Sequence, residues 1–442
     1  MTKTKKIHVK DKKEVIDHYL DYPYPLRNPE DEKTRLLQLD GENLNQINHY
    51  LFKGKQNFNN GFRVLIAGGG TGDSSTYLAE QLKNKNAEIV YLDFSKSSME
   101  IAKKRAEYRG LKNITFINDS IFNIPNLNLG KFDYINCSGV LHHLVSPPEG
   151  LSILQQSLKP EGGANIMVYA KYGRTAVYHI QDLMQRINEG VTKRDEEVKN
   201  TRTILSHLPQ TNWYARAQDL ISDVQNYGDI GIYDLFLHKQ DRCYSIDELY
   251  ELVEHAGSNF VEWSEILSRL TLRVENFIVD PAMLTKVKAM DIRKQQAIVE
   301  LLAGNIIKHT FYCSNIKDPV AKITDMNNVP LFFGITGVAK DMCNYLENNV
   351  LQAGQNVSLT VNSVWVKNGI NITIPVSEYT LSFFKAIKED NHMKSMGEIF
   401  AEINQDQKKK ISEQDFFALV ERSLRVFIDA GILVLRDKSI KD

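Results

Sequence analysis

The segment from Phe62 to Gly72, F-R-V-L-I-A-G-G-G-T-G, constrains the fold of this chain more than any other. Its first part, Val64 to Ala67, is an apolar run typical of a buried parallel strand. Three glycines follow at alternate positions, and Asp73 to Leu82 has the apolar spacing of an amphipathic helix. This order brings backbone N–H groups close to a ligand, at a distance where a Cβ would obstruct it.

An acid follows the next predicted strand. The apolar run from Ile89 to Leu92 ends in Asp93, and an acid in this position accepts hydrogen bonds from ribose hydroxyls. The sequence therefore predicts a nucleoside ligand. The dinucleotide fingerprint G-x-G-x-x-G would need a glycine where this chain has Asp73, whose carboxylate would repel a pyrophosphate. A dinucleotide is therefore disfavoured.

Further elements follow in order. Strands are predicted over Ile114–Ile117, Phe132–Cys137 and Ala164–Tyr169, and the sequence V-L-H-H comes after the middle one. With the G-x-G-x-G turn and the acid, this order resembles the class I S-adenosylmethionine-dependent methyltransferases. The resemblance implies an α/β fold with a Rossmann-like seven-stranded sheet and helical insertions. S-adenosylmethionine carries no phosphate, so Asp73 is compatible with it.

The resemblance also implies which residues hold the cofactor. Asp93 would bind the ribose and Asp119 the adenine amine. The implied set along the strand ends is Gly68, Gly69, Gly70, Gly72, Asp93, Phe94, Asp119, Ser120 and Ser138. Many family members carry an acid two residues before the first glycine, where this chain has Ile66. A side-chain contact from that position is therefore not expected.

The segment before the first strand is predicted to close over the cofactor. It contains Tyr19, Tyr22 and Arg27, and its prolines favour an extended path. An arginine can pair with the methionyl carboxylate, and an aromatic face suits a sulfonium. The alternative is a proline-rich loop packed on the surface. A helix is predicted from Leu36 to Phe52.

The methyl acceptor is expected to bind near the residues that follow the fifth strand. Tyr169, Tyr172 and Arg174 follow a strand end that faces the ligand crevice, or else they cap and pack the next helix. A helical insert is predicted over about 175–240. Its aromatic residues at 212–238 either form a wall of the acceptor pocket or form the insert's own core.

An amine acceptor must lose a proton before it attacks. His142, His143 or Tyr172 is expected to take this proton, directly or through water, although the histidines could instead serve packing. The leaving thioether is neutral, so no metal is expected. Orientation in a dry pocket can supply most of the catalysis.

The rest of the catalytic domain is predicted to end near Asp318. Strands are expected over Asn259–Trp263 and Lys308–Ser314, as an antiparallel edge of the sheet, with one helical insert from Ala282 to Gly304 between them. Ser245 and Glu248 form a capping-box pattern at a helix start. The predicted division is a lid and helices at 1–60, the methyltransferase domain at 61–318, a β-containing linker region at 319–375 and a module at 376–442.

The C-terminal module is predicted to be α+β and winged-helix-like. Strands at 357–366 and 370–374 would be joined by an Asn-Gly turn at 367–369. Helices are expected near 378–388, 395–404 and 412–430, before a strand at 432–435. Residues 378–442 carry eleven Lys or Arg against twelve Asp or Glu, so a protein-interaction module, in particular a homodimer contact, is favoured over DNA binding.

Composition narrows the class of function. The net charge of −1 gives no electrostatic case for nucleic-acid binding, and the Asn/Asp-Pro-Pro-aromatic motif of amine-directed nucleic-acid methylases does not follow the fourth strand. The four cysteines lie far apart, and no run is long enough to span a bilayer, so a cytoplasmic protein is expected.

The acceptor is the least constrained part of the prediction. The chain order is similar to that of bacterial rickettsial-type protein-lysine methyltransferases, which implies a protein lysine amine. Two alternatives remain open: a small-molecule acceptor, and a non-catalytic protein that only binds the cofactor.

Overall fold

A computed structural model describes most of the chain. The described residues are 23–219, 221, 223–238, 240–332, 338–348, 355–363, 366–376, 379–387, 394–405, 410–429, 431 and 433–440. Within these ranges no helix is both long enough and apolar enough to cross a membrane.

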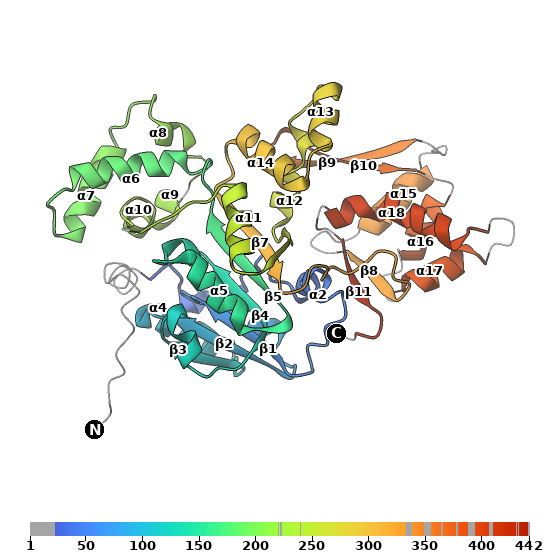
Figure 1. Ribbon diagram of the computed structural model, residues 1–442, viewed down its shortest axis with the longest axis horizontal. Coiled ribbons are helices and arrows are strands. Elements are labelled where there is room, and N and C mark those ends of the chain that lie inside the picture. The colour runs from blue at the N-terminus through green and yellow to red at the C-terminus, as the bar shows by residue number, and fades with distance from the viewer. Residues whose placement is uncertain are drawn as a thin grey trace.

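A seven-stranded mixed sheet forms the centre of the fold, in the order β3-β2-β1-β4-β5-β7-β6 (Figure 1). Its first five strands are parallel, whereas β7 runs antiparallel to both β5 and β6. The strands are β1 Phe62–Ala67, β2 Ala87–Asp93, β3 Ile114–Asn118, β4 Phe132–Ser138, β5 Leu158–Tyr169, β6 Asn259–Trp263 and β7 Lys308–Ser314. The predicted seven-stranded methyltransferase-type sheet with its antiparallel edge is confirmed.

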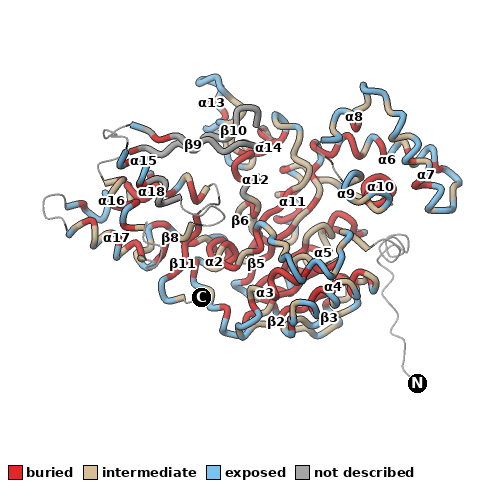
Figure 2. The backbone as a smooth tube through the Cα atoms, turned by 180° about the vertical axis from the view of Figure 1, so that it is seen from behind, coloured by how far each residue is buried: buried red, intermediate tan, exposed pale blue. Residues whose placement is uncertain are grey.

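The two faces of the sheet are covered by different helices and form two cores (Figure 2). Alternate residues of β1 point to opposite faces, so Leu65 belongs to the core with α5 and α11, and Ile66 to the core with α2 and α3. The covering helices are α2 Leu44–Leu51, α3 Asp73–Gln81, α4 Lys96–Tyr108, α5 Pro147–Ser157 and α11 Ile246–His255. The predicted capping box at the start of α11 is present.

Two local predictions in this domain need correction. The helix expected from Leu36 is confined to α2, because Asn43 caps its N-terminus after Gly41 takes a positive φ of 80°. The fifth strand starts at Leu158 rather than Ala164. A register shift against β4 lets the expected turn residues continue the strand.

Two helical insertions interrupt the sheet. The first confirms the insert expected at about 175–240 and packs around its own core, beside the sheet (Figure 1). Its helices are α6 Thr175–Ile187, α7 Arg194–Leu205, α8 Trp213–Ala217, α9 Asp223–Tyr227 and α10 Asp229–Phe236. The second contains α12 Ile266–Thr271, α13 Pro281–Lys288 and α14 Ile292–Ala303, with 3-10 turn η4 Val274–Asn276. The single insert expected there is divided where Asp291 caps α14.

The C-terminal elements lie on the opposite side of the sheet from the first insertion (Figure 1). They are β8 Asn328–Phe332, α15 Val338–Asn348, β9 Asn356–Ser363, β10 Val366–Pro375, α16 Thr380–Ile387, α17 Met396–Ile403, α18 Glu413–Asp429 and β11 Leu433–Asp437. The three helices before a short strand match the prediction, and their likeness to a winged helix stays a prediction.

The expected Asn-Gly turn is wrong. β9 ends at Ser363, so residues 367–369 lie inside β10, where the register shifts between Val366 and Ile370. A bulge accommodates the glycine there.

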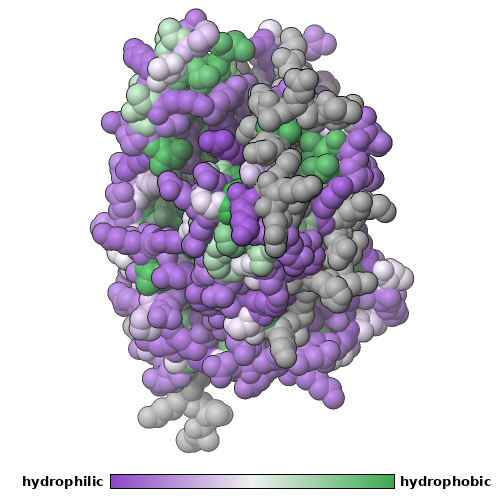
Figure 3. Space-filling view, turned by 90° about the vertical axis from the view of Figure 1, so that its right-hand side faces the viewer, coloured by the Kyte–Doolittle hydropathy of each residue, from purple (hydrophilic) through white to green (hydrophobic). Residues whose placement is uncertain are grey.

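The predicted linker region and the C-terminal module are joined. β8 pairs antiparallel with β11, and the N–H of Leu435 donates to Nδ1 of His49 on α2 at 2.9 Å. The module is therefore packed against the central domain through α2. The face that carries the C-terminal helices is mainly hydrophilic, with hydrophobic side chains in small separate groups (Figure 3). The homodimer contact stays a prediction.

Candidate functional site

The glycine turn between β1 and α3 leaves no room for side chains. A Cβ on Gly69 would lie 2.0 Å from the Tyr91 ring, and one on Gly68 would lie 2.4 Å from Val140. Gly68, like Gly70, has a positive φ, which favours glycine. The turn is thus packed from behind, and its backbone faces the carboxyl end of the sheet.

Asp93, the last residue of β2, holds this turn. Its Oδ2 accepts a hydrogen bond from the N–H of Gly70 at 2.7 Å, and its Oδ1 accepts one from Ser95 at 2.7 Å. Burial raises the pKa of Asp93 to about 6, although these two N–H donors act in the opposite direction. The carboxylate is therefore already oriented beside the turn.

Asp119 stands after β3 and is fixed in a similar way. Its Oδ1 accepts from the N–H of Ser120, and its Oδ2 accepts from the Asn123 amide, each at 2.8 Å. The two acids lie side by side because β2 and β3 are parallel neighbours that end together.

A cavity of about 670 Å³ opens at these strand ends. The predicted cofactor residues that line it are Gly68, Gly69, Gly70, Asp93, Phe94, Asp119, Ser120, Ser138 and Arg27. Gly72 lies outside this lining and caps α3 in the left-handed conformation. Tyr19 and Tyr22 lie outside the described residues.

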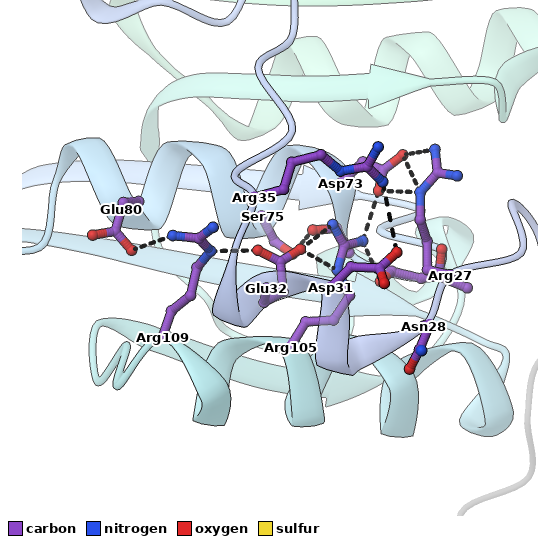
Figure 4. Close-up of polar contacts among 12 residues, drawn as sticks. Arg27, Asn28, Asp31, Glu32, Arg35, Asp73, Ser75, Glu80, Arg105 and Arg109 are labelled. Atoms are coloured by element: carbon purple, nitrogen blue, oxygen red, sulfur yellow. Dashed lines mark hydrogen bonds and ion pairs between the residues drawn. The ribbon is translucent and has the colours of Figure 1, made fainter.

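A network of ion pairs fixes the strap, the segment of residues 27–33 that precedes α2 (Figure 4). Arg27 donates to Asp73 through Nε at 2.9 Å and Nη2 at 2.8 Å. Arg105, which is 2% exposed, donates to Asp73 at 2.6 Å and pairs with Glu32 at 2.7 Å, and Arg109 also pairs with Glu32. The strap therefore lies against the start of α3.

This network changes the expected role of Arg27. Its pKa is raised, chiefly by the hydrogen bond to Asp73. Burial alone would raise the pKa of Asp73, but Arg27 and Arg105 outweigh burial and lower it. The guanidinium expected to bind the cofactor carboxylate is thus bonded to a carboxylate of the chain itself.

Among the residues predicted to take a proton, His143 lines the cavity, whereas His142 and Tyr172 lie outside the lining. Nδ1 of His143 is 2.9 Å from the Gln240 carbonyl, and His142 is fully buried behind it. Tyr169 also lines the cavity, with the Arg174 guanidinium stacked 3.5 Å from its ring centroid.

The aromatic insert contributes less to the cavity than one of the two interpretations expects. Tyr214, Tyr233 and Phe236 are buried in the insert's own core. Tyr227 and Asp234 line the cavity. The insert thus has a core of its own, and its role in an acceptor pocket stays a prediction.

Glu42 is the residue that sequence reasoning missed. It is 2% exposed, and its Oε1 accepts hydrogen bonds from Tyr134 at 2.8 Å and from Asn136 and Asn165 at 2.6 Å. Burial raises its pKa to about 7, although these donors act in the opposite direction. Asn136 pairs in register with Ile66, so Glu42 places an acid close to the strand position that lacks one.

The cavity lining is acidic. Seven carboxylate residues line it against three Lys or Arg residues. The acids are Asp40, Glu42, Asp73, Asp93, Asp119, Asp234 and Glu265; the cations are Arg27, Arg174 and Lys308. A cavity with this excess favours a ligand that carries positive charge, such as a sulfonium or an amine.

Comparisons with known proteins agree with this geometry. Residues 58–257 match the model of the family described as "Methyltransferase domain". The chain is 34% identical over 206 residues to an uncharacterized Synechococcus protein, covering 46% of this chain and 48% of that one. It is 32% identical over 143 residues to a ubiquinone biosynthesis O-methyltransferase of Vibrio cholerae, covering 31% of this chain and 55% of that protein. The chain thus spans about half the length of these relatives.

A solved structure resembles nearly the whole chain. PKMT2 from Rickettsia typhi in complex with AdoHcy matches with a TM-score of 0.60 at 18% identity, covering 92% of this chain and 76% of that one. This likeness shows the fold, and its extent includes elements outside the central sheet.

Proposed function

Because this chain carries a class I S-adenosylmethionine-dependent methyltransferase domain, we propose that it transfers a methyl group to a protein lysine amine. The observation that carries the acceptor proposal is the likeness to PKMT2, which covers 92% of this chain and so extends to the insertions and the C-terminal elements. PKMT2 comes from Rickettsia typhi, and the chain order resembles that of rickettsial-type protein-lysine methyltransferases.

The residues at the strand ends fit the cofactor. The glycine turn has no room for a Cβ at Gly68 or Gly69, so its backbone can come close to a ligand. Asp93 and Asp119 line the cavity, and we expect them to accept hydrogen bonds from the ribose and the adenine amine. S-adenosylmethionine supplies an activated methyl group on a sulfonium, with a neutral leaving group. The acidic lining favours that positive charge, and Asp73 disfavours a pyrophosphate at the same helix start.

The chain's own residues prepare the acceptor. The acidic lining also attracts an amine, and His143 stands at the cavity wall to take its proton, directly or through water. The bond from Nδ1 of His143 to the Gln240 carbonyl leaves Nε2 as the nitrogen with a lone pair. The cavity orients the two reactants and excludes water, which supplies most of the rate.

A small-molecule acceptor is the second candidate. It is favoured by the 32% identity to the ubiquinone biosynthesis O-methyltransferase, but that match covers 31% of this chain. The match leaves out most of this chain. The O-methyltransferase is therefore a weaker guide to the methyl acceptor than to the cofactor.

The test is to incubate the purified chain with methyl-labelled donor and a size-fractionated bacterial lysate. We expect label in the macromolecular fraction, sensitive to protease and recovered as methyl-lysine after hydrolysis. Asp93→Ala is the matched control and should weaken cofactor binding by about 1.5–3 kcal/mol, roughly ten- to a hundredfold, in calorimetry.

Three outcomes would contradict the proposal. Label confined to the low-molecular-weight fraction would favour the small-molecule candidate. Cofactor binding without label in any fraction would indicate a protein that only binds the cofactor. Unchanged affinity in Asp93→Ala would remove the ribose assignment.

A further inference from the structure

Two segments far apart in the chain are joined beside the cavity. The 3-10 turn η3 Leu141–His143 follows β4, and residues 240–242 lead out of the helical insert. The Gln240 side chain donates to the carbonyl of His143 at 2.9 Å, and the N–H of Arg242 donates to the carbonyl of His142 at 3.1 Å. These bonds, with that from His143 to the Gln240 carbonyl, fix the two segments in one place.

Three side chains with metal-ligating atoms converge at this junction. They are His142, His143 and Asp241, and one ligand atom from each lies within 4.8 Å of the other two. His142 is fully buried, and the side chain of Asp241 is 2% exposed. The cluster is therefore enclosed, unlike the carboxylate groups that gather on protein surfaces.

Several polar atoms of this cluster lack a partner within the described part of the chain. Both ring nitrogens of His142 and Oδ1 of Asp241 are buried without a hydrogen bond. Leaving such atoms unsatisfied costs free energy, and buried polar groups in folded proteins usually have a partner. The cluster thus has buried polar atoms whose hydrogen-bonding capacity is unused among the described residues.

We propose that His142, His143 and Asp241 bind a divalent transition-metal ion, zinc, at this junction. Two imidazoles and one carboxylate form a ligand set that zinc accepts, with a fourth position left for water. The bond from Nδ1 of His143 to the Gln240 carbonyl fixes the orientation of the ring and leaves Nε2 as the ligand nitrogen.

The positive charge of Arg174 would repel a metal ion at this site, but the position of the guanidinium limits this repulsion. Its Nη2 lies 3.9 Å from Oδ2 of Asp241, where the Gln181 amide also donates at 3.4 Å. These contacts occupy one carboxylate oxygen and leave Oδ1 for the metal. The excess of acids around the adjoining cavity offsets part of the repulsion between the guanidinium and the ion.

The site would connect the sheet to the helical insert. His142 and His143 follow β4, whereas Asp241 follows α10, so one ion would join both segments. His143 also lines the cavity, so the ion would stand next to its acceptor end. This inference rests on the cluster itself and does not depend on the proposed methyl transfer. It is an alternative to the role of His143 as proton acceptor, because a metal-bound Nε2 has no lone pair left for a proton.

The experiment uses the full chain. Bound metals are removed with a chelator, and the chain is titrated with Co²⁺, whose visible absorption reports nitrogen and oxygen ligands, and with Zn²⁺ by calorimetry. We expect one equivalent of metal per chain. His142→Ala and Asp241→Asn should each weaken binding at least about tenfold, whereas His207→Ala, at an exposed histidine, should leave it unchanged.

A thermal measurement distinguishes lost ligands from lost folding. Zinc should raise the Tm of the natural chain and of His207→Ala, but not that of Asp241→Asn. Circular dichroism should show that this nearly isosteric variant is folded. The proposal is overturned if the natural chain takes up no metal, which would leave a buried water as the partner of these atoms. It is also overturned if folded Asp241→Asn binds metal as the natural chain does.

Discussion

The cavity has two walls, and they differ in how their polar groups are satisfied. On the wall at the ends of β1, β2 and β3, Asp93 accepts two backbone N–H groups, Asp119 accepts two donors, and Asp73 is bonded to Arg27 and Arg105. Each of these acids is held in one orientation by the chain itself.

The wall around β4 and β5 differs. Oε2 of Glu42, which lines the cavity, is buried without a hydrogen-bond partner among the described residues, and so are both ring nitrogens of His142 and Oδ1 of Asp241, which lie behind the lining residue His143. One wall is thus arranged before any ligand binds, whereas the other has polar atoms that a ligand or ion would satisfy. The proposed cofactor side is thus argued from contacts that are present, and the proposed acceptor side from contacts that are missing.

The largest expected effect concerns the wall at the ends of β1, β2 and β3, where the polar groups have hydrogen-bond partners. Arg105→Met should lower the free energy of unfolding by about 3–5 kcal/mol, because it removes the buried guanidinium that pairs with both Glu32 and Asp73. Urea unfolding followed by circular dichroism measures this. Lys103→Met, on the same helix, is the control and should change stability by less than about 1 kcal/mol, because its ion pair is exposed. Equal losses in both variants would show that burial of the network contributes nothing.

A second prediction tests the unsatisfied wall through pH. Burial raises the pKa of Glu42 from 4.5 to about 7, so the folded chain retains this proton over a range where the unfolded chain has lost it. The contribution of Glu42 to stability therefore falls as pH rises from 4.5 to about 7, by on the order of 3 kcal/mol, and is constant above.

Glu42→Gln removes this titration and should flatten the curve of unfolding free energy against pH over that range. Denaturant unfolding at a series of pH values compares the two chains. Glu100→Gln, at a fully exposed carboxylate, should give a curve parallel to that of the natural chain. A parallel curve for Glu42→Gln would mean that Glu42 is not protonated in the folded state.

The smallest expected effect concerns the glycine turn. Gly69→Ala should weaken cofactor binding at least about tenfold, or about 1.4 kcal/mol, because its Cβ would meet the Tyr91 ring that packs behind the turn. Gly110→Ala adds a Cβ in open space and should cost some stability, from its positive φ, without changing affinity. Calorimetry with the cofactor separates the two, and full affinity in Gly69→Ala would show that the turn has room to move.

Local sequence patterns correctly predicted the elements of the wall at the ends of β1, β2 and β3. The apolar runs of β1 and β2, the glycines between them and the acid that ends β2 are adjacent in the sequence, so their arrangement follows from short-range rules. The capping box at Ser245 is confirmed for the same reason. The Asn-Gly turn failed, because strand pairing beyond the local motif placed residues 367–369 inside β10.

By itself, the sequence determined the order of strands and helices along the chain, the glycine turn, the acid that ends β2 and the acid that follows β3. Only the tertiary structure decided that Arg27 bonds to Asp73, that Glu42 reaches Asn136, and that Asp241 meets His142. These partners are separated by tens of residues and come together through strand register and helix packing. Such contacts depend on the whole set of packed elements, so no local pattern of residues can specify them.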